Sequence, residues 1–341
     1  MMGVEIAKDR KLWEEIVKSS TLTTIFHKWD WLKIMEKYST KRILRRRYKA
    51  RFYPLVISDG ETPIGVFPIF FYKGLAKFVC SPPSAVEDLY LGPVIANYDA
   101  LKQSKRESRL FSLVKEVDSF IRSELNPNFT LFITSPNLVD SRPFKWLGYE
   151  VEPRHTYILK LTNMEEIWGS FHRSLRRGIE KARRGGLVVK EGSEDDLKHI
   201  YDLLRERNRI HAPKEFVLEV YKKFYPNIRV FIAEKDGEKL SGIVNICYNE
   251  KVSFWIGSPK FSYKGINPNE LVFYESIKWA KENGFKYYEI MGADDLSLFE
   301  FKRKFNGDLV TFFTARKYSP RFVKIVEAIY RTIKPRYEYR S

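Results

Sequence analysis

Short runs of apolar residues alternate along this chain with segments in which apolar residues recur every three or four positions. The first pattern is typical of β-strands and the second of amphipathic helices. In the second half of the chain, the spacing of Leu197, Ile200, Tyr201 and Leu204 predicts a helix over residues 195–209. Strands are then predicted over residues 229–234, 242–248 and 252–257.

The next helix has clear start and stop signals. Asn267 can cap it, Pro268 suits its first position, and Glu270 stands where a capping-box acid belongs. Gly284 ends the helix, and a strand over residues 286–291 follows at once. A strand, a helix and a strand in this order form a parallel pair with a crossover. The sequence therefore predicts an α+β fold with a mixed sheet and helices on both faces.

Part of this pattern occurs twice. Residues 59–61 (Asp-Gly-Glu), Gly65 and residues 81–82 (Ser-Pro) recur 177 positions later, and residues 144–145 (Phe-Lys) recur 157 positions later. A constant offset over several motifs indicates a tandem duplication, with extra residues inserted in the first copy. We expect a first, degenerate domain over residues 1–155, joined through residues 149–155 to a second over 156–318. The second domain begins with a basic helix predicted over residues 165–184.

Composition agrees with two globular domains. The chain has 341 residues, of which 44% are hydrophobic, so it can bury two cores. The longest apolar run, residues 64–72, is about half a membrane span and contains Pro68. The N-terminus lacks a signal-peptide pattern, and Cys80 and Cys247 are expected to be buried thiols. These features predict a cytoplasmic protein, with contact at the inner face of the membrane left open.

The net charge of +17 is shared by both halves of the chain. One interpretation is a polyanionic partner, such as RNA or a nucleotide-linked or lipid-linked substrate. The other is the densely charged surface typical of proteins from thermophiles. No protein partner can be inferred from this pattern.

The order of elements in each copy, closed by a Phe-Lys-x-x-Phe segment in the second, resembles the GNAT acyltransferase core. Two such cores in one chain resemble the Fem family, the tRNA-dependent aminoacyltransferases that build peptidoglycan cross-bridges. The resemblance covers residues 24–316 and rests on residues 29–32, 140–149, 157–161, 177–182, 268–269 and 301–305. It implies two tandem GNAT-like domains, with the site in the second.

The resemblance also bears on the donor. In GNAT proteins the loop before the core helix is glycine-rich, and its backbone amides bind the pyrophosphate of coenzyme A. Here residues 262–267 keep only Gly265. Acetyl-CoA is therefore disfavoured, no cofactor is expected, and aminoacyl-tRNA is the implied donor. Tyr263 in this loop and Asn269 in the first helical turn are candidate substrate contacts.

A helix predicted over residues 170–184 combines an apolar stripe with many basic residues. Guanidinium groups match phosphate geometry, so phosphate contact with tRNA or a diphosphate-linked acceptor is one interpretation. A solvated helix face is the other. The candidates are Arg173, Arg176, Arg177 and Lys181, and the resemblance favours Arg177; Glu180 stands where the family pattern carries arginine.

Lys302 is the predicted catalytic residue. Acyl transfer to an amine passes through a tetrahedral oxyanion, which a fixed cation stabilises. In Fem proteins the lysine of this motif serves the aminoacyl end of the tRNA. Phe301 and Phe305 are the associated substrate-binding candidates, since an aromatic ring can stack on a terminal adenine. The alternative is that both phenylalanines are core residues and Lys302 is a surface lysine.

Other chemistry is weaker. The five histidines show no metal-ligand spacing, and no metal site is predicted. Asp294 and Asp295 follow a predicted strand and fit either a general base or a capped turn. Residues 319–341 have an amphipathic, basic pattern that fits a helix on an anionic membrane or one docked on its own domain.

Three functions remain open from the sequence. The first is a Fem-like acyltransferase that forms an amide on a cell-envelope or polysaccharide precursor. The second is a coenzyme A-dependent N-acyltransferase acting on an amino sugar. The third is a non-catalytic basic module that binds RNA or an anionic surface, for which Lys302 would be dispensable.

Overall fold

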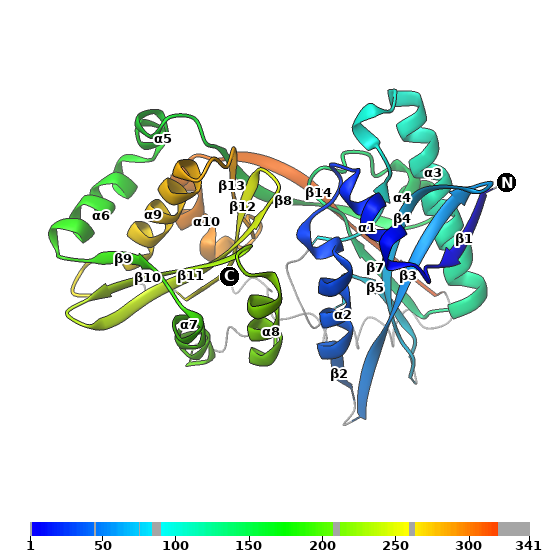
Figure 1. Cartoon of the computed structure of the whole chain (residues 1–341), viewed down its shortest axis with the longest axis horizontal. Helices are drawn as coiled ribbons and strands as arrows, with labels where there is room; N and C mark the ends of the chain where they lie inside the picture. The colour runs from blue at the N-terminus through cyan, green and yellow to red at the C-terminus, as the bar shows by residue number, and fades with distance from the viewer. Residues whose placement is uncertain are drawn as a thin grey trace. The chain divides into compact units, whose positions relative to one another are not determined.

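The computed structural model of the chain (Figure 1) describes residues 2–43, 46–74, 76–83, 90–206, 212–258 and 263–319. Contacts divide the chain into two compact units. The first comprises Met1–Arg154 and Thr311–Ser341, and the second comprises His155–Val310. Most of the predicted C-terminal helix, residues 320–341, lies outside the described residues.

The first unit is a mixed sheet with the strand order β1-β3-β4-β5-β7-β14. Pairs β3–β4 and β4–β5 are antiparallel, and β5–β7 is parallel. Strand β14 (Asp308–Tyr318) closes the unit antiparallel to β7. Its elements are β1 (Met2–Ile6), α1 (Arg10–Lys18), α2 (Trp29–Tyr38), β2 (Thr40–Ile43), β3 (Arg46–Asp59), β4 (Thr62–Tyr72), β5 (Phe78–Ser81), β6 (Val94–Ile95), α3 (Gln103–Phe120, continued by a π-helical turn over Ile121–Leu125), β7 (Phe129–Ile133) and α4 (Arg142–Trp146).

The second unit has the strand order β8-β13-β12-β11-β10-β9. Figure 1 shows α6 and α9 on one face of this sheet and α7 and α8 on the other. Its elements are β8 (Glu150–Lys160), α5 (Met164–Ser170), α6 (Arg173–Arg184), β9 (Val188–Glu191), α7 (Glu194–Glu206), α8 (Lys214–Phe224), β10 (Ile228–Lys235), β11 (Glu238–Tyr248), β12 (Lys251–Ser258), α9 (Pro268–Glu282), β13 (Tyr287–Ile290), α10 (Leu296–Lys302) and β14 (Asp308–Tyr318), which leads back to the first unit.

The two units repeat one arrangement. Strands β3-β4-β5-β7 of the first unit correspond in order and direction to β10-β11-β12-β13 of the second. Helices α3 and α9 make the crossover before the parallel strand in each unit. The predicted α+β fold, with two tandem copies and a mixed sheet flanked by helices, is therefore confirmed.

The repeated Asp-Gly-Glu sequence forms a hairpin turn in both copies, but the turn is displaced by one residue. In the first copy the two turn residues are Gly60 and Glu61, between paired residues Asp59 and Thr62. In the second they are Asp236 and Gly237, and both have positive φ, 51° and 80°. The glycine keeps its left-handed conformation in each copy, with φ 60° at Gly60, which is a conformation that favours glycine.

The strand that closes each sheet comes from the other half of the chain. Strand β8 follows the first copy but pairs with β13, and β14 follows the second copy but pairs with β7. The predicted link over residues 149–155 contains the boundary between the two units, which falls between Arg154 and His155, but residues 150–155 belong to β8 instead of preceding a strand. The same exchange places residues 311–318 in the first unit, whereas the sequence pattern grouped them with the second domain.

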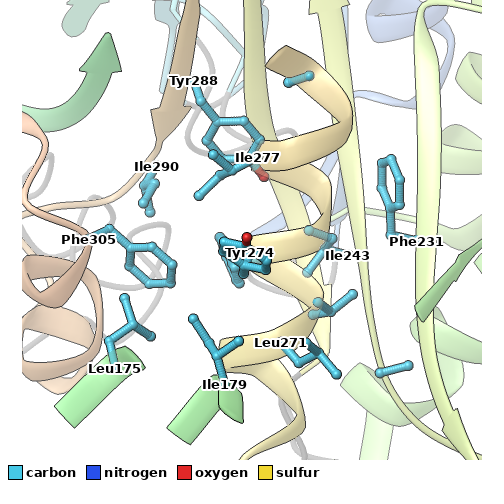
Figure 2. Packing of buried hydrophobic residues seen from close by; sticks show 14 of the residues in the cluster. Leu175, Ile179, Phe231, Ile243, Leu271, Tyr274, Ile277, Tyr288, Ile290 and Phe305 are labelled. Atoms are coloured by element: carbon cyan, nitrogen blue, oxygen red, sulfur yellow. The ribbon is translucent and has the colours of Figure 1, made fainter. Parts of the chain in front are cut away.

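Both cores follow the alternation of the strands. In the first unit Phe67 and Ile69 face helix α3, while Phe70 stacks on Phe52 at 5.2 Å between ring centroids on the other face. In the second unit, Leu175 and Ile179 of α6 pack on the α9 side of the sheet, as Figure 2 shows. Phe305 closes this core together with residues of β13, so α6, α9 and the segment after α10 form one packed layer.

The helices of the second unit differ from the sequence prediction in two ways. The basic helix is interrupted, because α5 ends at Ser170 and His172 caps α6 by accepting a hydrogen bond from the Ser174 amide at 3.2 Å. Helix α8 is not predicted by the sequence pattern at all. Within the described residues, no helix combines the length and the apolar character needed to cross a bilayer. Cys80 and Cys247 are buried, as expected.

Candidate active site

The parallel strands β12 and β13 separate before β12 ends. Their pairing runs from Lys251 and Tyr287 to Phe254 and Ile290. Strand β12 continues to Ser258, bound to β11, with an irregularity in the register after Phe254. Bulges of this kind are frequent next to active sites. Beyond Phe254, among the strands that the structure describes, β12 therefore pairs only with β11.

The loop after β13, residues 291–295, organises the side chains at this point. Met291 and Gly292 accept hydrogen bonds from Lys302 through their carbonyl oxygens. The Ala293 amide donates to the backbone carbonyl of His155 at 3.3 Å, and the Asp294 carboxylate binds His155. Asp295 caps α10 by accepting from the Ser297 amide at 2.8 Å. Residues 291–295 thus bind the Lys302 ammonium and the His155 imidazole. They also cap α10, the helix that carries Lys302.

Lys302 is buried rather than exposed, with 4% of its surface accessible. Its ammonium donates to the Gly292 carbonyl at 2.9 Å and to the Met291 carbonyl, and lies 5.9 Å from the centre of the Phe254 ring. Burying a charge is costly unless hydrogen bonds compensate it, and the two carbonyls supply that compensation. The interpretation of Lys302 as a surface lysine is therefore wrong.

Gly292 is required by this arrangement. Its φ is +78°, which favours glycine, and a Cβ atom there would lie 2.9 Å from the Lys302 ammonium nitrogen. The backbone at Gly292 can therefore approach the ammonium group closely only because the residue has no side chain.

The two aromatic candidates lie in the core. Phe305 is fully buried, and its ring packs on Phe171 at 5.6 Å. Phe301 is partly buried between Phe273 and Phe305, each at 5.4 Å between ring centroids. Phe305 is therefore a core residue, and its ring has no exposed surface for a ligand. The exposed aromatic ring on α10 is Phe299, which is 38% exposed and which the sequence analysis did not select.

His155 and Asp294 form a pair that the sequence analysis missed. The imidazole Nδ1 lies 2.8 Å from Asp294 Oδ1, and the His155 amide donates to Asp294 Oδ2 at 2.9 Å. Both side chains are about one third exposed, at 32% and 30%. Of the two adjacent acids, Asp295 caps a helix and Asp294 is bound to a histidine.

The basic candidates on α6 divide into two groups. Arg173 and Arg177 are exposed, and Arg176 is partly buried with an Nε atom that has no hydrogen-bond acceptor among the described residues. Lys181, by contrast, donates to the Gly265 carbonyl at 2.7 Å and so fastens α6 to the loop before α9. The first three remain available for phosphate, whereas Lys181 has a structural contact.

The amino end of α9 is the place at which the GNAT fold offers amides to a pyrophosphate. Here Tyr263 and Ile266 donate their amides to each other's carbonyls, at 2.8 and 2.9 Å. The Asn269 backbone amide donates to the Asn267 side-chain oxygen at 3.1 Å. The Asn269 side-chain oxygen accepts a hydrogen bond from the Ser241 hydroxyl. Asn269 is 5% exposed. As placed, it fixes the helix on the sheet, and several amides of this segment are already satisfied.

A buried acid lies in the same first turn. Glu270 is 6% exposed, and its carboxylate packs directly on Gly178 of α6, where a Cβ atom would meet Oε2 at 1.6 Å. Burial raises the pKa of Glu270, and the Lys304 ammonium, 3.3 Å from Oε1, opposes this shift. A carboxylate at a helix amino end interacts favourably with the helix dipole, so it competes with any incoming anion.

Comparison with known proteins agrees with this geometry. The model of the acetyltransferase (GNAT) domain matches residues 169–303. A UDP-N-acetylmuramoylpentapeptide-lysine N(6)-alanyltransferase from Weissella viridescens is 25% identical over 171 residues, which are 46% of this chain and 51% of the relative. The crystal structure of FemX matches with a TM-score of 0.66 and 14% identity, covering 94% of this chain and 98% of that one. A tandem GNAT protein from the clavulanic acid biosynthesis pathway matches with a TM-score of 0.54 and 9% identity, covering 93% and 98%.

The resemblance to the Fem-type, double-GNAT proteins is confirmed. The matched residues 169–303 contain α6, α9, α10 and Lys302. The match to the acetyltransferase (GNAT) domain model and the similarity to the alanyltransferase both agree with the predicted acyltransferase class. The chain spans about half the length of that relative, so its own activity, donor and acceptor are matters for proposal and experiment.

Proposed function

We propose that this chain transfers an acyl group from an ester-activated donor to an amine, forming an amide. The observation that carries the proposal is the buried ammonium of Lys302, held where β12 and β13 separate. Negative charge develops on the carbonyl oxygen during acyl transfer, and a fixed cation in a water-poor environment stabilises it more than a solvated one would. In this position Lys302 stabilises the charge on the carbonyl oxygen without a cofactor.

The donor that fits best is an aminoacyl ester such as aminoacyl-tRNA. Coenzyme A would need backbone amides at the amino end of α9 for its pyrophosphate. The amides of Tyr263, Ile266 and Asn269 are already engaged within the protein. The buried Glu270 carboxylate adds an acid to the same turn. These features support a donor other than coenzyme A and oppose the alternative of an acetyl-CoA-dependent enzyme.

We accordingly expect acetyl-CoA to bind with a dissociation constant above about 1 mM, since a free-energy gain of roughly 4 kcal/mol or less remains without the pyrophosphate contacts. Titration calorimetry of the purified chain with acetyl-CoA measures this directly. Desulfo-CoA serves as a second ligand that has the same pyrophosphate. Micromolar binding of either compound would favour the coenzyme A-dependent alternative.

The acceptor proposed here is a primary amine on a phosphate-bearing cell-envelope precursor. The relative from Weissella viridescens is named for alanyl transfer to the lysine N6 of UDP-N-acetylmuramoylpentapeptide. In this chain, Arg173, Arg176 and Arg177 of α6 offer guanidinium groups to phosphate oxygens, whether these belong to the acceptor or to a tRNA. The partly buried Arg176, with its Nε atom lacking an acceptor among the described residues, supports a ligand at this surface.

The double variant Arg173→Ala/Arg177→Ala is expected to weaken binding of the anionic substrate by about tenfold and to reduce the dependence of affinity on salt, because each lost phosphate contact removes one counterion-release step. Filter binding of tRNA and of UDP-N-acetylmuramoylpentapeptide over a range of salt concentrations tells which of the two uses α6. Lys115 is exposed on α3 in the first unit. The variant Lys115→Ala is therefore the control for the loss of one cation from the surface of a helix. Equal salt slopes for the wild-type chain and the double variant would remove α6 from the binding site.

The function itself is tested by mixing the chain with a pool of aminoacyl-tRNAs and UDP-N-acetylmuramoylpentapeptide and measuring the product mass. An added aminoacyl residue on the acceptor amine is the expected result. If acetyl-CoA replaces the tRNA pool productively, the coenzyme A-dependent alternative holds. If tRNA or acceptor binds but no donor gives a product, the chain is the non-catalytic basic module.

A further inference from the structure

We propose that His155, oriented by Asp294, accepts the proton of the attacking amine in this reaction. The inference rests on the proposed function and adds a residue to it. His155 lies at the beginning of the second unit and Asp294 lies 139 residues later, in the loop after β13. The resemblance to known families assigns no role to either residue.

The hydrogen bonds of His155 determine which of its ring nitrogens carries the proton. An ionised carboxylate only accepts, so His155 must donate from Nδ1 to Asp294 Oδ1 across 2.8 Å. The neutral ring then has its lone pair on Nε2. Asp294 Oδ2 also accepts from the His155 amide at 2.9 Å, so one carboxylate fixes both the backbone and the ring of His155. With about one third of its side chain exposed, the ring can be reached by a substrate.

The same loop connects this pair to Lys302. Residues Met291 and Gly292 hold the ammonium, and Asp294 follows two positions later. The Ala293 amide binds the His155 carbonyl at 3.3 Å, so β8 is attached to the loop between the two groups. A base and a cation are therefore placed by one short segment. Nucleophile activation and oxyanion stabilisation need such a fixed relation.

The amine nitrogen attacks the ester carbonyl carbon, a C–N bond forms, and the carbonyl π electrons move to the oxygen near Lys302. Nε2 of His155 takes one proton from the amine nitrogen. The C–O bond of the ester then breaks, and the imidazolium returns the proton to the departing oxygen. The products are an amide and an alcohol, and His155 is neutral again.

The variant His155→Asn tests the proposal, because its side-chain amide can still donate to Asp294 but has no group equivalent to Nε2. We expect kcat to fall by about 10²- to 10⁴-fold, the range for loss of a general base, with KM changed by less than about threefold. Added imidazole is expected to restore part of the rate. His199→Asn on α7 is the matched control and should keep wild-type kcat. A His155→Asn protein with wild-type kcat would overturn the proposal.

A second measurement does not depend on activity. Nitrogen-15 NMR of the histidine-labelled wild-type chain should show His155 with its proton on Nδ1, and Asp294→Asn should change this to a mixture of tautomers. Asp294→Asn should also lower kcat by about tenfold or more with KM little changed. A His155 ring protonated on Nε2 in the wild-type chain contradicts the proposal even if His155→Asn fails to fold. A wild-type chain inactive with every donor but with the Nδ1–H tautomer contradicts the proposed function instead.

Discussion

Replacing Lys302 with methionine is expected to lower kcat for amide formation by about a hundredfold or more, which corresponds to roughly 3–4 kcal/mol of transition-state stabilisation. Methionine is preferred to alanine because Lys302 is buried, and a truncated side chain would leave a cavity. It has nearly the same length and removes only the charge and the hydrogen bonds to Met291 and Gly292. Single-turnover rates at saturating substrate separate this loss from weaker binding.

The repeat supplies the control. Lys145 corresponds to Lys302 in the first copy, but it is exposed on α4. Lys145→Met should therefore keep the wild-type rate while changing the net charge by the same amount. Circular dichroism melts of both variants report whether the fold survives. Similar rates for the two variants would mean that Lys302 has a structural role only, as the non-catalytic alternative requires.

The sequence predicts the local features of this molecule well. Asn267 caps α9 as expected, and Pro268 occupies the first position of that helix. The hairpins around Gly60 and Gly237 and the parallel strands after α3 and α9 also follow from local patterns. Such features depend on residues within a few positions of each other, and the hairpins and parallel strands occur in both copies.

The sequence does not predict which distant segments meet. The exchange of β8 and β14 depends on pairings such as that of Lys317 with Thr130, far apart along the chain. The His155–Asp294 pair spans 139 residues, and no local pattern singles it out among five histidines. A useful signal was nevertheless present: Asp294 and Asp295 follow a strand end, and only one of two adjacent acids can serve as the helix cap.

The repeat is also a poor guide to burial. Phe144 is fully buried and Lys145 is exposed, whereas Phe301 is partly buried and Lys302 is buried. The helices α4 and α10 therefore present the same two residue types to different surroundings. A sequence match between copies shows common ancestry of the segment, but the orientation of each side chain follows from the packing of the helix that carries it.

Replacing Glu289 with leucine is expected to lower the free energy of unfolding of the second unit by about 3–5 kcal/mol, the cost of breaking a buried ion pair. Glu289 has no exposed surface, and it lies on β13 directly before the end of the parallel pairing. Its carboxylate accepts from Thr156 at 3.0 Å, from Ser253 at 2.9 Å and from the Lys251 ammonium at 2.6 Å. Urea unfolding, with hydrogen exchange of the β13 amides, measures the loss.

The double variant Lys251→Met/Glu289→Leu decides what causes that loss. Lys251 has 25% of its side chain exposed and would be left beside an apolar residue in the single variant. Replacing both partners by apolar residues removes the uncompensated charge, so the double variant should recover stability relative to Glu289→Leu. Glu282→Leu on α9 removes the partner of Lys278 in an exposed pair and should cost no more than about 0.5 kcal/mol. If the double variant is as unstable as the single one, the hydrogen bonds from Thr156 and Ser253, rather than the charge of Lys251, make Glu289 necessary at the end of β13.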